Sequence, residues 1–182
     1  ERNGLTTIKS LVGDCAQTGL ASGSFNVVLG VALIHHLEVE RERALYREVH
    51  RLLVPGGTAL FCESLNNCRV FDFLISLVPV RQKHNPRPSR LSPKWKEHVL
   101  NNPHPVRPNT TRHYMEMLRD AGFQKVEVEE LGILSRCDRL TTNARLRKWI
   151  HDVDYRMGRF LPFRGALSRN IVIRLQKESP LE

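Results

Sequence analysis

The sequence has few cysteines and no long apolar run, and both shortages exclude whole classes of protein. Its four cysteines form no Cys-x-x-Cys pair, so neither a disulfide framework nor a zinc site is indicated. Free thiols favour a reducing compartment, and we expect the cytoplasm. No stretch approaches the roughly 20 apolar residues that a membrane-spanning helix requires, and there is no signal-peptide pattern.

Acidic residues are scarce beside basic ones: 28 Lys and Arg stand against 19 Asp and Glu, a net charge of +9. This balance allows a nucleic acid, an anionic lipid or an acidic substrate as partner and does not choose among them. Segment 79–108 carries much of the excess and holds seven of the ten prolines. We expect one partial domain over residues 1–182, with this segment as a basic insertion that is either a solvated loop or a lid over an anionic substrate.

Hydrophobic patterning predicts strands that alternate with helices. Short β-branched or apolar runs predict the strands, and apolar residues at a 3.6-residue period predict the helices. The predicted strands are 6–12, 25–31, 58–62, 123–131 and 169–175, and the predicted helices are 38–53, 112–121 and one within 138–160. This order indicates an α/β fold with a mostly parallel sheet covered by helices on both faces.

Polar residues stand where three predicted strands end, and ligands bind at the carboxyl ends of parallel strands. Asp14 follows the first strand, His35 and His36 follow the second, and Glu63 follows the third. Metal binding by the two histidines is not favoured, because adjacent side chains point apart and no partner lies at ligand spacing. We expect His35 near the substrate or as a general base, His36 at the start of the next helix, and Glu63 facing the substrate.

Two longer stretches resemble a known family. "GDCAQTGLASGSFNVVLGVALIHHL" and "EVHRLLVPGGTALFCES" are similar to the middle of the class I S-adenosylmethionine-dependent methyltransferases, with their Gly-Asp, "SFD-V", "HHL" and "LxPGG" motifs. "LRDAGFQKVEVEEL" is similar to a late helix and strand of that family. The resemblance implies a Rossmann-like sheet with one antiparallel strand at its edge, and S-adenosylmethionine as cofactor.

The resemblance also implies which residues meet the cofactor. Asp14 and Cys15 would contact its adenine, and Val31, Ala32 and Leu33 would lie beside its methionine part. His35 would lie near the site of methyl transfer, with Glu63 as a further catalytic candidate. The reaction is an in-line attack on the sulfonium methyl, for which the enzyme mainly supplies proximity and sometimes a base.

The sequence departs from the family pattern at two places. Asn26 stands where "SFD" has its aspartate, and no GxGxG motif follows any strand. We expect an N-terminally truncated domain without the first two strands and the glycine-rich loop, and weak cofactor binding by this chain alone.

Several functions remain open at this stage. The leading one is methyl transfer to a small-molecule or glycolipid-like acceptor, which the basic balance allows to be anionic. The alternatives are a methyltransferase of tRNA or another nucleic acid, a nucleic-acid-binding module that uses the basic insertion, and a non-catalytic relic of the fold. The sequence does not indicate an oligomeric state.

Overall fold

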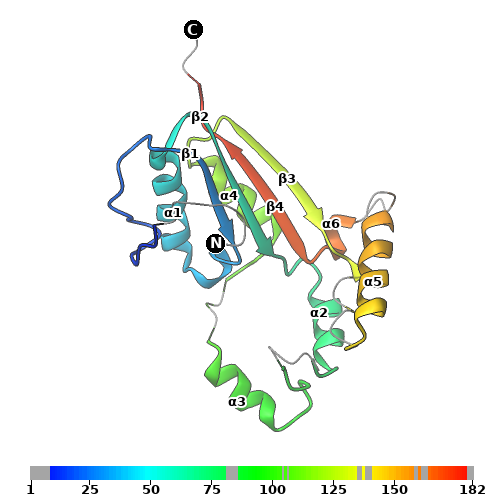
Figure 1. Cartoon of the computed structure of the whole chain (residues 1–182). Helices are drawn as coiled ribbons and strands as arrows, with labels where there is room; N and C mark the ends of the chain where they lie inside the picture. The colour runs from blue at the N-terminus through cyan, green and yellow to red at the C-terminus, as the bar shows by residue number, and fades with distance from the viewer. Residues whose placement is uncertain are drawn as a thin grey trace.

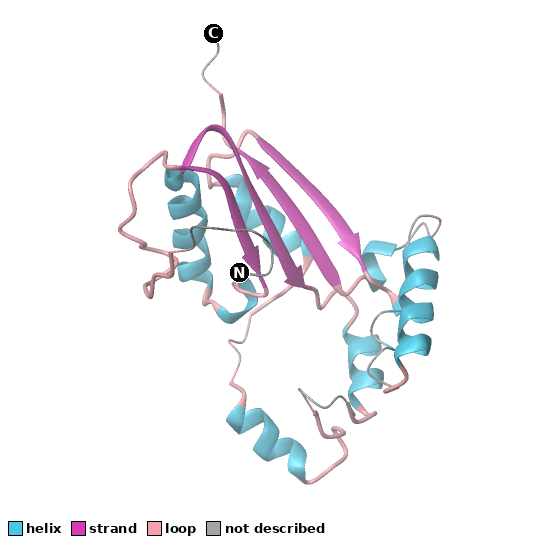
Figure 2. Ribbon diagram, viewed as in Figure 1, coloured by secondary structure: helices cyan, strands magenta, loops and turns pink. Residues whose placement is uncertain are grey.

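A computed structural model describes residues 9–80, 86–103, 105, 107–134, 137, 141–157, 160 and 164–179 of the chain. Its centre is a four-stranded sheet with the order β1-β2-β4-β3 (Figures 1 and 2). β1 and β2 are parallel, whereas β4 is antiparallel to both β2 and β3. The strands are β1 (Phe25–Val31), β2 (Leu53–Ser64), β3 (Lys125–Leu131) and β4 (Asn170–Gln176).

The helices fall into two groups around this sheet. Helices α1 and α4 pack against one face of it, while α2, α5 and α6 gather near the end of β3, and α3 stands apart from the sheet (Figure 1). A short 3-10 helix, η1, connects β1 to α1. The bounds are η1 (Ile34–His36), α1 (Val39–Leu52), α2 (Arg69–Ser76), α3 (Lys94–Asn101), α4 (Thr111–Arg119), α5 (Ala144–Met157) and α6 (Arg164–Leu167).

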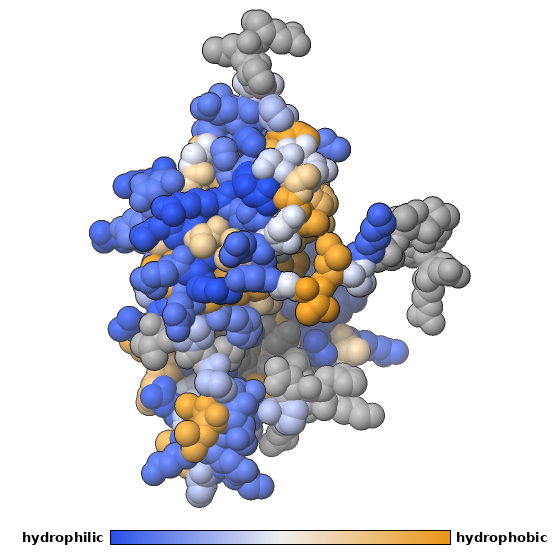
Figure 3. All heavy atoms as spheres, turned by 90° about the vertical axis from the view of Figure 1, so that its left-hand side faces the viewer, coloured by the Kyte–Doolittle hydropathy of each residue, from blue (hydrophilic) through white to orange (hydrophobic). Residues whose placement is uncertain are grey.

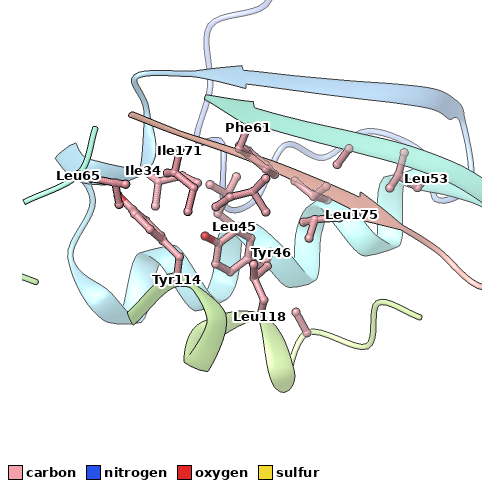
Figure 4. Close-up of a cluster of buried hydrophobic side chains, with 14 residues drawn as sticks. Ile34, Leu45, Tyr46, Leu53, Phe61, Leu65, Tyr114, Leu118, Ile171 and Leu175 are labelled. Carbon is pink, nitrogen blue, oxygen red and sulfur yellow. The ribbon is translucent and has the colours of Figure 1, made fainter. Parts of the chain in front are cut away.

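The hydrophobic core lies between the sheet and the two helices α1 and α4 (Figure 4). Tyr46 from α1 and Tyr114 from α4 are fully buried there beneath Phe61 of β2. Tyr46 meets the Phe61 ring edge-on, with ring centroids 5.9 Å apart. Gly30 is required beside this ring, because a Cβ atom at that position would lie 2.4 Å from a carbon of Phe61.

The opposite face of β1 remains apolar and exposed. Val27, Leu29 and Val31 are 53%, 68% and 73% exposed, and Cys62 on the neighbouring β2 is exposed as well. Figure 3, which views the molecule from the left-hand side of Figure 1, shows hydrophobic side chains reaching the surface among hydrophilic ones. A sheet face with such apolar side chains is usually covered by helices. In the described part of the chain, however, no helix packs over this face.

The α/β class predicted from the sequence is confirmed, and most predicted elements are present within a few residues. The strand predicted at 6–12 is wrong for residues 9–12, which form no strand, while residues 6–8 lie outside the described part. Leu11 and Val12 are exposed there, so the apolar run has no neighbour to pair with.

The antiparallel strand corrects one expectation that the family resemblance implied. It lies inside the sheet, between β2 and β3, rather than at the edge. β4 pairs with β2 along one side and with β3 along the other, so neither of its sides is an edge. The described part of the proline-rich segment 79–108 includes the eight-residue helix α3.

Candidate functional site

The parallel strands β1 and β2 end side by side, and the candidate site is built at that end. After Val31 the chain turns sharply at Ala32, whose φ of 51° makes it the only non-glycine residue of the described chain with positive φ. The Ala32 amide still donates to the carbonyl of Cys62 on β2, at 2.9 Å. A left-handed alanine costs free energy, so the surrounding bonds must hold it in place.

Glu63 supplies much of this support from the end of β2. Its carboxylate accepts hydrogen bonds from the backbone amides of Leu33 and Ile34, both at 2.8 Å, and a longer one from His35 at 3.4 Å. The Glu63 side chain is fully buried. It therefore faces the turn after β1, and not open space where a substrate could touch it.

His35 is joined to Glu63 by its side chain as well. Its Nδ1 lies 2.7 Å from the Oε2 of Glu63, and the ring is 17% exposed. Since an ionised carboxylate only accepts, the hydrogen of the neutral ring sits on Nδ1 and the lone pair on Nε2. This arrangement of an imidazole oriented by a carboxylate is the one found in general-base pairs.

Arg107 fastens the same turn from the other side. Its Nη1 donates to the carbonyls of Ile34 (2.9 Å) and Leu37 (2.8 Å), and its Nη2 pairs with the buried carboxylate of Glu42. His113 reaches that carboxylate at 2.9 Å, and the hydroxyl of Tyr46 donates to it at 3.0 Å. Burial raises the pKa of Tyr46 well above its ordinary value, and Glu42 adds to the shift, so the hydroxyl keeps its proton.

Sequence reasoning missed Arg107, Glu42 and His113 as parts of the site. Arg107 lies in the proline-rich insertion, and its partner Glu42 comes from α1, which is 65 residues away in sequence. A charged glutamate among the apolar positions of α1 is the one sequence signal that could have indicated a buried partner.

The residues expected to contact a cofactor lie around this turn. Asp14 accepts from the amide of Ala16 through Oδ1 (2.9 Å) and from Arg41 through Oδ2 (2.5 Å). Arg41 lies in the first turn of α1, so this pair ties Asp14 to the start of that helix. The others have different degrees of exposure: Cys15 and Leu33 are half-buried against the core, while Val31 and Ala32 are exposed.

No metal site is present at this end or elsewhere in the described ranges. No group of three or more His, Cys, Asp or Glu side chains among the described residues is arranged to hold an ion. His35 and His36 lie beside one another with ring centroids 4.1 Å apart. Within the same part of the chain, every helix is too short or too polar to cross a membrane.

The loop that carries Asp14 is held by Glu48 of α1, and this contact is pH-dependent. Glu48 binds Arg51 and accepts from both the amide (3.0 Å) and the hydroxyl of Thr18, which lowers its pKa to about 2. A carboxyl with a lowered pKa stabilises the fold above its unfolded pKa and loses that contribution as the pH falls toward the folded value. We expect Glu48→Gln to be less stable than the wild type at pH 5 to 7, with the difference shrinking between about pH 4.5 and 2. Urea unfolding across this range measures it, and a constant difference would contradict the assignment.

Comparisons with known proteins agree with this geometry. A family model described as a methyltransferase domain matches residues 1–61. A search among curated proteins returned no match. These 61 residues include Asp14, β1 and the start of β2 up to Phe61, so the match covers most of the strands that form the candidate site.

Solved structures share the fold at low sequence identity. A S-adenosylmethionine-dependent methyltransferase from Archaeoglobus fulgidus aligns with a TM-score of 0.53 and 14% identity over 92% of this chain and 66% of its own. Geranyl diphosphate C-methyltransferase from Streptomyces coelicolor, solved with S-adenosylhomocysteine, aligns with a TM-score of 0.53 and 14% identity over 93% of this chain and 54% of its own. Phosphoethanolamine N-methyltransferase 2 from Haemonchus contortus aligns with a TM-score of 0.50 and 14% identity over 91% of this chain and 36% of its own.

The fold is thus that of the Rossmann-like methyltransferases. Together with the family match over residues 1–61, it agrees with the resemblance to class I S-adenosylmethionine-dependent methyltransferases seen in the sequence. The Haemonchus contortus enzyme has also been solved in complex with S-adenosyl-L-methionine. The chain spans between 36% and 66% of the length of the three structures described above.

Proposed function

We propose that the protein to which this chain belongs transfers a methyl group from S-adenosylmethionine to a small-molecule or glycolipid-like acceptor. The observation that carries the proposal is the pair of His35 and Glu63 at the shared carboxyl end of β1 and β2. The cofactor supplies an electrophilic methyl on a sulfonium, and an acceptor that must lose a proton needs a base beside it.

In this proposal the chain's residues orient the reactants and hold the proton. Nε2 of His35 takes the proton of the acceptor, and Glu63 fixes the ring and stabilises the imidazolium that forms. Glu63 is thus a positioning residue, because its carboxylate is buried against the backbone amides. Fixed orientation of this kind can lower the barrier of a two-reactant step substantially.

The remaining roles concern the cofactor. We infer that Asp14 and Cys15 contact the adenine, and that Val31, Ala32 and Leu33 line the methionine part. The support is that the Asp14 loop and the exposed turn after β1 lie at the same end of α1 and the sheet. We also infer a cytoplasmic location, which the free state of all four cysteines supports.

The test is cofactor binding and methyl transfer by the whole protein. We expect incorporation of labelled methyl from S-adenosylmethionine, and calorimetric binding of S-adenosylhomocysteine that Asp14→Ala weakens about tenfold through loss of a charged hydrogen bond. Asp152→Ala, on the exposed surface of α5, is the matched control. A whole protein that binds neither compound would overturn the proposal.

A further inference from the structure

We propose that Arg87, Arg90 and Arg169 form a binding site for an anionic oxygen group of the methyl acceptor, a phosphate or a carboxylate. The inference rests on the proposed function, which it deepens by naming a substrate class. It is carried by a buried guanidinium nitrogen without a partner, by the gathering of three like charges, and by their place beside the candidate site.

Backbone hydrogen bonds hold Arg87 in place, but one donor of its side chain has no hydrogen-bond partner among the described residues. Its backbone exchanges two hydrogen bonds with Val80, at 2.8 and 3.2 Å. Its guanidinium carbon lies 4.9 Å from the centre of the Trp95 ring. The Nε atom is buried and has no hydrogen-bond partner among the described residues. A buried N–H without an acceptor is costly, so an acceptor from a ligand would be favourable here.

The charges around Arg87 repel it. Burial lowers the pKa of Arg87, and Arg169 and then Arg90 add to that shift. The one acidic residue of segment 81–108, Glu97, is exposed on α3. Guanidinium groups near one another form a positive field that an anion neutralises, and the planar fork of arginine matches phosphate and carboxylate oxygens.

The cluster lies at the sheet end that carries the candidate site. The Arg169 amide donates to the carbonyls of Leu131 (3.1 Å) and Gly132 (2.9 Å), and its carbonyl accepts from the amide of Leu65, just after β2. Leu65 is two residues beyond Glu63. An anion on these arginines would therefore be bound at the edge of the sheet where β2 ends.

Arg90 lies outside helix α2 but is held against it by two contacts. Its amide donates to the carbonyl of Ser76 at 2.9 Å, and its guanidinium carbon lies 5.0 Å from the centre of the Phe73 ring. Arg87 and Arg90 are thus both stacked on aromatic rings, which holds each guanidinium group in position while its edge can still donate to an anion.

Trp95 provides a direct reporter of this site. The chain has two tryptophans, and the other, Trp149, is 61% exposed on α5. In a Trp149→Phe chain, inorganic phosphate added at constant ionic strength is expected to change the fluorescence of Trp95 saturably. Arg169→Gln and Arg90→Gln leave Arg87 on Trp95 and are expected to weaken phosphate binding about tenfold each.

Arg47→Gln, on the exposed face of α1, is the matched control and is expected to change the affinity less than about twofold. A parallel titration with acetate shows whether a carboxylate binds at the same site, and circular dichroism confirms that the variants fold. The proposal is overturned if phosphate causes no saturable change in Trp95 fluorescence or if chloride causes an equal change. It is also overturned if the control Arg47→Gln weakens phosphate binding as much as Arg169→Gln and Arg90→Gln do. Phosphate binding needs neither cofactor nor turnover. The chain can therefore bind phosphate without transferring methyl groups, or transfer methyl groups without binding phosphate, so the two proposals are tested separately.

Discussion

Replacing His35 by glutamine is expected to lower the turnover of methyl transfer by about 10²- to 10⁴-fold, the usual contribution of a positioned general base. Glutamine retains the polar character of the position but cannot take a proton. Because His35 touches the acceptor only in the proposed reaction step, the loss is expected mainly in kcat, with a smaller change in KM. Initial rates with labelled S-adenosylmethionine over a range of acceptor concentrations measure both.

His151→Gln on the exposed part of α5 is the matched control, since it removes the same group from a helix rather than from the end of β1. Glu63→Gln tests the support of the turn and the orientation of the His35 ring together. Its amide cannot accept from all the backbone amides that the carboxylate serves, so both stability and turnover are expected to fall. A His35 variant with wild-type turnover across the pH range would exclude a base role and leave His35 as a neighbour of the substrate.

Replacing Glu42 by alanine is expected to destabilise the chain by about 3 to 5 kcal/mol, the cost of leaving a buried cation without its partner. Arg107 and Glu42 are almost completely buried, with side-chain exposures of 1% and 0%. The variant would also leave the hydroxyl of Tyr46 without its acceptor and remove the carboxylate that contacts the His113 ring. Urea unfolding monitored by circular dichroism gives the free energy of unfolding.

A double-mutant cycle with Arg107→Met tests whether the pair acts as a unit. The combined variant is expected to be less destabilised than the sum of the two single changes, by about 1 kcal/mol or more. Arg112→Met is the control, because Arg112 pairs with Glu116 on the exposed surface of α4, where an ion pair contributes little. Additive effects of Glu42 and Arg107 would show that they stabilise the fold independently.

The sequence predicted the parts of the fold that depend on local pattern. Apolar runs and the 3.6-residue period placed β1, β3, β4 and helices α1 and α4 close to their observed bounds, whereas β2 begins at Leu53, well before the predicted strand 58–62. Run 6–12 failed for its described part because a strand exists only where a second strand supplies hydrogen bonds, and none lies beside residues 9–12. The position of β4 inside the sheet depends on burial between two neighbours, which a local window does not contain.

For the candidate site, the sequence placed His35 and Glu63 at strand ends, and the parallel arrangement of β1 and β2 brought them together; Asp14 instead follows residues that form no strand. Only the tertiary structure decided what each group does. Hydrogen bonding to three backbone amides turned Glu63 from an expected substrate contact into the support of the turn that carries His35. The tertiary structure also brought together Arg107, Glu42 and His113, which lie in a loop, in α1 and in α4. A buried charge is tolerated only beside its partner, and Arg107 and Glu42 meet only in the folded chain because they are distant in sequence.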